Sequence, residues 1–309
     1  MRAIALSKFG GPEVLEEKKN LPKPTIDKPT QILVRVHSSG INPVDTYVRS
    51  GILGTRPFPY IPSRDGAGVV EEVGSGVKKF AKGDRVWFTS ADTGTSAEYS
   101  IVDASTAFPL PKNLSMDQGA CLGIPYLTAH RALFIKDRAK KGERVLIHGA
   151  TGGVGVAAVQ LAAHHGCTVL GTFGSAEGEA LIQDNGAAAT FNHRKKGYIA
   201  AIKKAYPEEV DLIIEMLADK NLGDDLGLLK QGGRIVIVGA QGDATVAPWT
   251  MMMREITVSA ISLGSSSTSE YAEGAAAVAA LFRDTKRRPE IKKTYPFTEL
   301  DQVAPPTFC

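Results

Sequence analysis

The sequence contains few cysteines, only three among its 309 residues. Cys121, Cys167 and Cys309 are too few and too widely spaced for a disulfide framework or a CxxC metal knuckle. No apolar run is long enough to span a bilayer, and the segment after Met1 reaches a charged residue and then glycines before a signal-peptide core could form. These absences favour a soluble protein of a reducing, cytoplasmic compartment with no membrane partner.

The sequence also lacks a strong excess of either charge. Its 36 basic and 33 acidic residues leave a formal net charge of +3. Such a balance gives no concentrated basic field, which argues against nucleic acid as the main partner and leaves RNA as a minor alternative. The nearest approach to a basic patch is Lys195, Lys196, Lys203 and Lys204, whose helical spacing is more typical of a solvated face.

The length and the texture of the chain indicate two domains. A chain of 309 residues exceeds what one hydrophobic core usually organises. Residues 1–124 are turn-rich with short β-branched runs, which predicts a compact, mostly β domain. Residues 125–263 alternate strands with Ala-rich helices, the pattern of a doubly wound parallel sheet. The remaining segment, 264–309, is expected to open with a helix, because Ser267 and Glu270 have capping-box spacing, and to return to the first domain.

Five apolar segments are the strand candidates of the second domain. They are Val145–Ile147, Thr168–Leu170, Leu212–Ile214, Ile235–Val238 and Ile256–Val258. With the helical segments between them, they predict an α/β fold in which a Rossmann nucleotide domain is combined with the mostly β domain.

A glycine cluster follows the first of these strands and leads into a helix-like run. Compared with the G-x-G-x-x-G template, Ala150 replaces the first glycine, while Gly152 and Gly155 match the other two. A tight turn, close approach of the backbone and helix N-terminal amides would suit a pyrophosphate. Glycines also gather in strand-to-helix turns that bind nothing, but the flanking strand and helix favour a dinucleotide site.

The end of the second strand indicates which dinucleotide is bound. An acid about 20 residues after the glycines would hold the ribose 2′-hydroxyl of NAD, but residues 171–175 contain no carboxylate. At the next strand end, Asn192, His193 and Arg194 could donate hydrogen bonds to a 2′-phosphate, or could form an ordinary solvated loop. The sequence therefore predicts NADPH rather than NADH.

Zinc catalysis is not expected, because the sequence offers too few ligands. The six histidines show no partner at ligand spacing, and structural burial explains Cys121 and Cys167. A reductase without metal or covalent nucleophile must position the nicotinamide hydride against an electron-poor acceptor. Quinones suit this chemistry, because their reduction needs hydrogen-bond donors at an oxygen but no strong Lewis acid.

Several motifs along nearly the whole chain carry a family resemblance. They are residues 40–51 (GINPVDTYVRSG), 83–86 (GDRV), 123–129 (GIPYLTA), 148–155 (HGATGGVG) and 214–218 (IEMLA). Through them the chain resembles the zinc-free quinone oxidoreductases of the zeta-crystallin type, members of the medium-chain dehydrogenase/reductase superfamily. The resemblance implies a GroES-like catalytic domain, an NADPH-dependent quinone reductase activity and a homo-oligomer.

The resemblance also implies site residues. Asn42 and Tyr47 would line the nicotinamide and substrate cleft as catalytic residues, with Tyr47 also touching the cofactor. The remaining cofactor-binding residues would be Thr151, Gly152, Gly153, Val154, Gly155, Gly174, His193, Asn221, Val238, Gly239, Ala240, Gln241, Ile261, Ser262 and Leu263.

The chain departs from the family pattern at three places. It has Pro62-Ser63-Arg64-Asp65 where relatives commonly carry Pro-Gly-x-Asp, which adds a cation near the cleft. Gly178 replaces a lysine that some bacterial relatives use for the 2′-phosphate. After residue 304 the family would continue through a helix and a closing strand, whereas this sequence ends with residues 305–309 (PPTFC), and reduced stability is the expected consequence.

Two alternatives remain open from the sequence. The same scaffold could reduce an alkenal or enone at carbon, and the residues barely separate this activity from quinone reduction. A second alternative is a nucleotide-binding protein with little catalysis, serving as a crystallin or an RNA-associated factor. The residues are equally compatible with hydride and with single-electron transfer.

Overall fold

The computed structural model describes residues 1–297 and 299, and the chain divides into two compact units. The first unit comprises Met1–Ile124 and the described residues from Arg288 onward, and the second comprises Pro125–Arg287. The first boundary coincides with the expected one. The second lies at Arg287–Arg288 and not at 264, which corrects the expected return of residues 264–287 to the first domain.

The last helix explains this correction. Helix α9 (Thr268–Asp284) packs against α4 (Gly153–His165) of the second unit, and Phe282 meets Tyr126 edge-on with ring centroids 5.5 Å apart. The predicted capping box is present, since Ser267 Oγ accepts from the Glu270 backbone and the Glu270 carboxylate accepts from Ser267 N. Within the expected return segment, only the described residues from Arg288 onward belong to the first unit.

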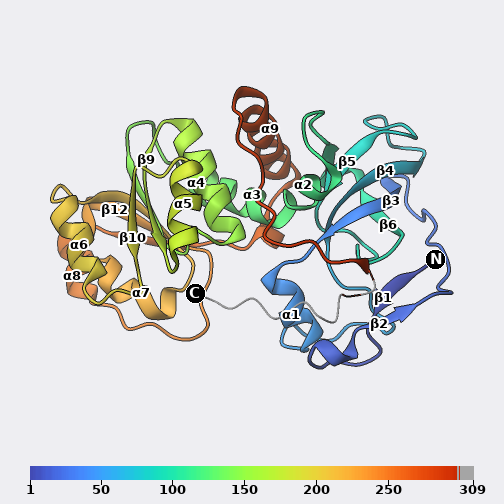
Figure 1. The fold of residues 1–309 in the computed structure, drawn as a ribbon, viewed down its shortest axis with the longest axis horizontal. Coiled ribbons are helices and arrows are strands. Elements are labelled where there is room, and N and C mark those ends of the chain that lie inside the picture. The colour runs from blue at the N-terminus through green and yellow to red at the C-terminus, as the bar shows by residue number, and fades with distance from the viewer. Residues whose placement is uncertain (298, 300–309) are drawn as a thin grey trace. The chain divides into compact units, whose positions relative to one another are not determined.

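The first unit is built on antiparallel strands. A five-stranded sheet has the order β6-β3-β4-β5-β7, and β1 pairs with β2 beside it (Figure 1). The strands are β1 (Ala3–Ala5), β2 (Glu16–Lys18), β3 (Gln31–Gly40), β4 (Asp65–Val73), β5 (Arg85–Phe88), β6 (Tyr99–Asp103) and β7 (Ala107–Pro109). The helices are η1 (Pro12–Val14), α1 (Pro43–Arg49), η2 (Ala104–Thr106) and α2 (Met116–Ala120).

The β-branched runs of the sequence form the core of this sheet. Ile32 and Val34 of β3, Val70 of β4 and Val86 of β5 are fully buried in one hydrophobic cluster. Burying several such side chains contributes about 1.5–3 kcal/mol each. The predicted mostly β domain is therefore confirmed, with β3 and β4 at its centre.

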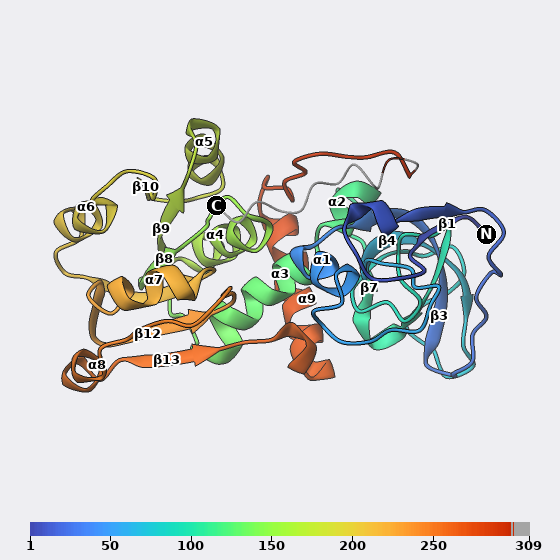
Figure 2. The same cartoon turned by 90° about the horizontal axis from the view of Figure 1, so that it is seen from below.

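The second unit contains a parallel six-stranded sheet of order β10-β9-β8-β11-β12-β13. Helices flank the sheet, and α4 and α5 lie beside β9 (Figures 1 and 2). The strands are β8 (Arg144–Ile147), β9 (Thr168–Phe173), β10 (Ala189–Asn192), β11 (Val210–Glu215), β12 (Leu229–Ile237) and β13 (Thr257–Ala260). The other elements are α3 (Gly123–His130), η3 (Arg131–Lys136), α5 (Ala176–Asp184), α6 (Tyr198–Ala205), α7 (Ala218–Asp225), α8 (Pro248–Arg254) and η4 (Leu263–Ser265).

Central strands of this sheet are apolar on both faces. All six residues of β11 are buried, and its Ile213 packs with Leu146 of β8 and Ile235 of β12. Such continuous apolar strands are typical of parallel sheets covered by helices. All five predicted strands are confirmed. The strand end expected at residues 192–194 is that of β10, whose own residues were not assigned from the sequence and are only partly buried.

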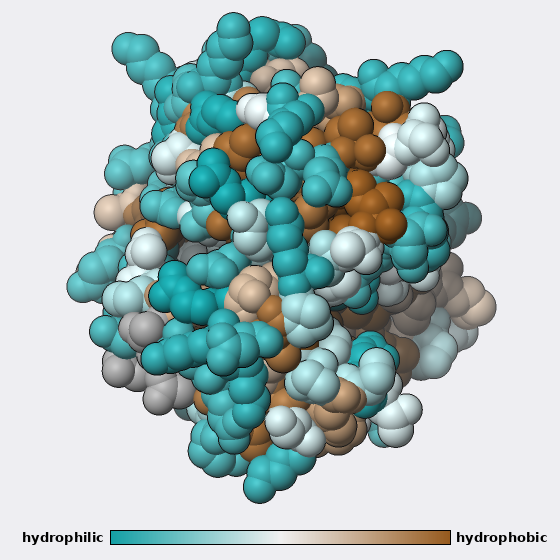
Figure 3. All heavy atoms as spheres, turned by 90° about the vertical axis from the view of Figure 1, so that its right-hand side faces the viewer, coloured by the Kyte–Doolittle hydropathy of each residue, from teal (hydrophilic) through white to brown (hydrophobic). Residues whose placement is uncertain are grey.

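No helix among the described residues is both long and apolar enough to cross a membrane. The face turned to the viewer in Figure 3 carries mostly hydrophilic side chains, with apolar ones in separate groups between them. The expectation about the end of the chain, residues 305–309, falls outside the described residues.

Candidate functional site

The carboxyl ends of the parallel strands gather most of the predicted cofactor residues. Because these strands run in one direction, the segments that follow them lie along one edge of the sheet. Strands β8 and β11 are neighbours, and the order continues outward from them in opposite directions. Ligands of open α/β sheets bind at such a switch point.

The glycine turn after β8 is held by its own backbone. Gly149 adopts a left-handed φ of 57°, and Gly152 N donates to Gly149 O over 3.0 Å. A Cβ on Gly155 would overlap Gly149 O, so only glycine fits this close approach of helix and turn. Gly152 and Gly153 are exposed at the N-terminus of the 13-residue helix α4. Because these glycines have no side chains, their backbone is accessible to a pyrophosphate at the positive end of the helix dipole.

The end of β9 faces two basic side chains. A Cβ on Gly174 would lie 3.0 Å from both His193 Nε2 and Arg194 Nε, so these three residues lie together. Burial lowers the pKa of His193 below its ordinary value, and the Arg194 charge lowers it further. No carboxylate lies between Gly171 and Ser175.

Two further features border this strand end. A Cβ on Gly178 would approach Thr151 Cγ2 to 2.8 Å, so this helix position lies against the glycine turn. A surface pocket of about 270 Å³ lies at the ends of β9 and β10 and is lined in part by Phe173, Asn192 and Lys195. Its size is near the lower limit of small-molecule sites.

The remaining predicted cofactor residues follow β11, β12 and β13. Asn221 lies in α7, and its Nδ2 donates to Glu215 Oε1 and Oε2 over 3.1 and 3.2 Å. Gly239 O accepts from Ala218 N over 3.0 Å, and Gln241 N donates to Asp219 Oδ1 over 2.8 Å. These bonds join the loop after β12, with Val238 and Ala240, to the start of α7. Residues 261–263 directly follow β13 on the same edge.

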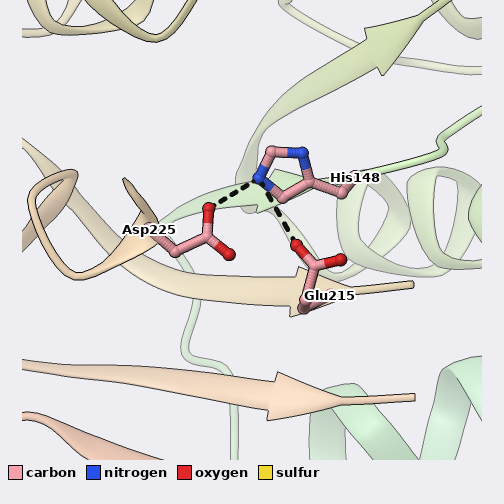
Figure 4. A group of neighbouring side chains, drawn as sticks. All are labelled: His148, Glu215 and Asp225. Carbon is pink, nitrogen blue, oxygen red and sulfur yellow. Dashed lines mark hydrogen bonds and ion pairs between the residues drawn. The ribbon is translucent and has the colours of Figure 1, made fainter. Parts of the chain in front are cut away.

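A cluster of ionisable side chains lies at the switch point. His148 follows β8, Glu215 ends β11 and Asp225 ends α7, and all three are buried. His148 Nε2 lies 2.8 Å from Asp225 Oδ1 and 3.7 Å from Glu215 Oε2, so both carboxyl groups approach one ring nitrogen (Figure 4). We refer to His148, Glu215 and Asp225 as the switch-point cluster.

In the first unit, helix α1 positions the two residues expected to be catalytic. Asn42 precedes the helix with extended backbone, and its N–H donates to Asp45 Oδ2 over 2.7 Å. Pro43 occupies the first helical position, where its missing N–H costs nothing. Tyr47 lies one turn further and is half-buried, and burial raises the pKa of its phenol above the ordinary value. The phenol therefore stays protonated at neutral pH.

Asp65 is the fully buried partner of Asn42. Asn42 Nδ2 and Ile124 N donate to its Oδ2 over 2.9 and 2.6 Å, and Thr89 Oγ1 donates to its Oδ1 over 2.7 Å. Burial raises the pKa of Asp65 to about 6 in spite of these donors. Burial, with a contribution from the Asp65 charge, raises the pKa of Asp45 to about 7.

Residues 62–65, where the sequence differs from the Pro-Gly-x-Asp pattern of the family, have two notable structural features. Ser63 is buried with a left-handed φ of 65°, a conformation that favours the glycine common in relatives. Arg64 is exposed and donates to Ser90 O over 3.2 Å. Its charge also lowers the pKa of Asp65, although less than burial raises it.

The described thiols do not have the character of metal ligands. Cys121 Sγ donates to Asp117 O over 3.4 Å, and burial raises the pKa of this thiol to about 11. Burial likewise raises the pKa of Cys167 to about 11, and both cysteines are free and half-buried. Among the described residues, the switch-point cluster alone has the spacing of a metal site.

Sequence reasoning did not assign Asp45, Asp65 or the switch-point cluster to the site. A usable signal existed for two of them, because His148 and Glu215 are ionisable residues at the ends of apolar strands that are neighbours in the sheet. Asp225 carried no such signal, since it reaches the cluster only through the position of α7.

Comparisons with known proteins agree with this architecture. Residues 153–280 match the family model described as zinc-binding dehydrogenase, and residues 28–112 match the alcohol dehydrogenase GroES-like domain. The chain is 46% identical over 305 residues to the quinone oxidoreductase of Rattus norvegicus, covering 98% of this chain and 92% of that protein. It is 45% identical to the enzyme of Homo sapiens over the same shares.

Solved structures show the same fold. The quinone oxidoreductase of Escherichia coli complexed with NADPH matches with a TM-score of 0.85 at 27% identity, covering 98% of this chain and 94% of that one. An NAD-dependent alcohol dehydrogenase matches with a TM-score of 0.89 at 26% identity, over the same shares. The fold and the two family models thus define a medium-chain dehydrogenase/reductase with a GroES-like domain, which confirms the predicted fold class.

Within that class, the identities of 46% and 45% to quinone oxidoreductases define the family more closely. The chain belongs to the quinone oxidoreductases of the zeta-crystallin type. It is therefore an oxidoreductase, as the sequence motifs predicted.

Proposed function

We propose that this protein reduces quinones with NADPH and without zinc. The observation that carries the choice of cofactor is the end of β9, where an acid-free strand end faces His193 and Arg194 across Gly174. A carboxylate there would repel a 2′-phosphate, whereas two nitrogen-bearing side chains attract one. The quinone is proposed because the relatives of high identity are quinone oxidoreductases.

The proposed cofactor cradle follows the sheet edge. Thr151, Gly152, Gly153, Val154 and Gly155 would hold the pyrophosphate against the N-terminus of α4. Gly174 and His193 would hold the 2′-phosphate. Asn221 and residues 238–241 and 261–263 would line the rest of the dinucleotide. When bound, NADPH supplies the reducing equivalents at its nicotinamide ring.

Asn42 and Tyr47 are the proposed residues for the acceptor. Reduction of a quinone builds negative charge on its oxygen, and a positioned hydrogen-bond donor stabilises that charge. The raised pKa of Tyr47 keeps its phenol protonated and able to donate. Asn42 is fixed by its bond to Asp65, so its amide is held in place before substrate arrives.

The donor set of the first unit supports metal-free chemistry. Both Asp65 oxygens already accept hydrogen bonds from protein donors, and the raised pKa of Cys121 keeps its sulfur protonated. Zinc binds thiolate, imidazole and carboxylate groups that are free to coordinate. Neither Asp65 nor Cys121 fits that requirement.

We also propose a homo-oligomer in a reducing, cytoplasmic compartment. Helix α8 carries three exposed apolar side chains, Trp249, Met252 and Met253, and the next strand, β13, is an edge strand of the sheet. Exposed apolar groups beside a strand at the edge of the described sheet support association. The free thiols of Cys121 and Cys167 support the reducing compartment.

A turnover screen tests the proposed function. Purified protein is given NADPH or NADH with an ortho-quinone or with an unsaturated ketone, and cofactor oxidation is followed. We expect oxidation of NADPH with the quinone. If only the unsaturated ketone consumes NADPH, the enzyme is an enone reductase, and if NADPH binds without turnover, the protein is a nucleotide-binding crystallin or RNA-associated factor.

A further inference from the structure

The switch-point cluster contains more negative than positive charge if all its groups are ionised. His148 follows β8, Glu215 belongs to β11 and Asp225 to α7, and their side chains are 2%, 0% and 0% exposed. Two buried carboxylates beside a single imidazolium would leave one uncompensated charge away from water. Such a charge is costly in a protein interior, and a buried carboxyl group near another one takes up a proton instead.

Hydrogen-bond geometry shows where one proton is needed. Asp225 Oδ1 is paired with His148 Nε2, but the buried Asp225 Oδ2 has no donor among the described residues. The carboxyl group of Glu215 faces this side of Asp225 in Figure 4. A proton on Glu215 would give Asp225 Oδ2 its donor and would remove the surplus charge in one step.

Glu215 is also the residue that holds Asn221. Glu215 Oε1 accepts from the backbone N–H of Leu217, and both of its oxygens accept from Asn221 Nδ2. Asn221 Oδ1 in turn accepts from Tyr198 over 3.4 Å. The carboxyl group therefore fixes the amide of Asn221 and the loop after β11 together.

We propose that Glu215 is a positioning residue that keeps a proton at neutral pH, donates it to Asp225, and thereby holds Asn221 for the dinucleotide. The second half of this proposal rests on the proposed function, because it assigns Asn221 to NADPH. The first half concerns the unliganded protein alone. The proton is shared between two carboxyl oxygens and is not transferred to substrate.

The electrostatics of the surrounding groups agree with this arrangement. Burial raises the pKa of Glu215 to about 7, and the neighbouring Asp225 adds to the rise while His148 opposes it. Burial opposes the charged form of His148, but the Asp225 and Glu215 carboxyl groups outweigh it and raise its pKa. Two ionisable neighbours respond to the cluster, since Asp225 and Glu215 help burial to raise the pKa of Tyr198, and the His148 charge helps to lower that of His193.

Two nearly isosteric variants locate the proton. Glu215→Gln replaces a protonated carboxyl group by an amide that can accept from Leu217 and Asn221 and donate to Asp225. Asp225→Asn instead removes the negative partner of His148. We expect the NADPH dissociation constant of Glu215→Gln to stay within about threefold of the wild type, and that of Asp225→Asn to rise at least about tenfold, a loss of about 1.4 kcal/mol.

Melting temperatures of the unliganded protein give an independent readout. Because the pKa of Glu215 is raised on folding, its contribution to stability is lost as the pH rises through about 7. The Glu215→Gln variant has no proton to lose at this position. The melting temperature of the variant relative to that of the wild type should therefore increase from pH 5 to pH 8. No such gain, or an unfolded Glu215→Gln beside a folded Asp225→Asn, would overturn the proposal.

Metal analysis of the wild type and of Glu215→Gln tests whether a metal ion occupies the switch-point cluster in place of the proton. If dialysed wild-type protein retained one equivalent of zinc or manganese and Glu215→Gln did not, the cluster would be a cation site and the proposal would be wrong. If the wild type fails to bind NADPH, the proposed function fails, and the melting curves still decide where the proton lies.

Discussion

Asn42 Nδ2 donates to Asp65 Oδ2 over 2.9 Å, and both side chains are buried in the first unit. This bond joins the start of helix α1 to the first residue of β4. It fixes an amide that we place beside the acceptor, and it gives a buried carboxyl group one of its donors. We therefore propose that this residue pair connects stability with activity.

Replacing Asn42 by Ala is expected to lower both the stability of the protein and its turnover with quinone. The loss of a donor to buried Asp65 should lower the free energy of unfolding by about 1–3 kcal/mol, measured by urea denaturation. Thr89→Val removes the donor to the other Asp65 oxygen and is the matched control. Both variants should lose stability, but only Asn42→Ala should lose turnover with quinone beyond the loss of folded protein. Equal losses of turnover in the two variants would make Asn42 a purely structural residue.

The pH dependence of stability should follow the two buried carboxyl groups of the first unit. The pKa values of Asp45 and Asp65 are raised to about 7 and about 6 from an ordinary 3.8, so the folded protein holds more protons than the unfolded one. Their contribution is complete below about pH 4 and is lost as the pH rises to about 7.

Asp45→Asn tests this directly. The variant should gain melting temperature relative to the wild type as the pH is raised from 5 to 8, because it has no proton to lose at this position. Asp243→Asn, at an exposed side chain of the second unit, controls for the loss of one acidic group. A difference between Asp45→Asn and wild type that does not change with pH would contradict the assignment.

Two glycines of the turn after β8 should separate folding from binding. Gly155→Ala places a Cβ against Gly149 O and should lower the melting temperature strongly. Gly152→Ala meets only an ordinary contact at 3.4 Å and has a φ of −78°, so it should fold normally. Its Cβ should nevertheless weaken NADPH binding, measured by fluorescence titration. Normal affinity in Gly152→Ala would place the pyrophosphate elsewhere.

The pair at the end of β10 should set the choice between cofactors. A charge-assisted hydrogen bond contributes about 1.5–3 kcal/mol, so replacing both His193 and Arg194 by Gln should raise the Michaelis constant for NADPH by about tenfold or more. The constant for NADH, which lacks the phosphate, should change little. Lys204→Gln, on the exposed side of α6, is the control for lost positive charge. An equal effect on both cofactors would refute the phosphate role.

Helix α8 should determine the oligomeric state. Trp249 is 70% exposed and Met253 is 56% exposed, so replacing both by Glu should prevent association through this face. Light scattering after gel filtration should show an oligomer for the wild type and a smaller species for the variant. Ile52→Glu changes an exposed apolar residue of the first unit and should leave the mass unchanged. A monomeric wild type would disprove the oligomer itself.

The sequence was sufficient for features that depend on local patterns. The glycine spacing predicted the turn after β8, and the capping residues Ser267 and Glu270 predicted the start of α9. The lack of an acid in residues 171–175 drew attention to His193 and Arg194, and the structure brings both side chains close to Gly174. In each case the residues that act together are close in the chain or follow neighbouring strands.

Features that depend on packing between distant segments were not predictable in this way. Helix α9 was assigned to the wrong unit, because the apolar pattern of a helix does not indicate which surface the helix packs against. The end of strand β10 was expected near residue 192, but its residues were not assigned, because a half-buried edge strand has no continuous apolar run. Asp65 and Asp225 look like ordinary surface acids in the sequence, and only tertiary structure shows that both are buried.

Zinc-independent reduction of quinones by NADPH can be tested through the rate of NADPH oxidation with an ortho-quinone in the constant presence of a strong metal chelator. We expect oxidation that depends on quinone, that is unaffected by the chelator, and that exceeds the rate with NADH at equal concentration. Activity that disappears with the chelator and returns with zinc, or an absence of quinone-dependent oxidation, would contradict it.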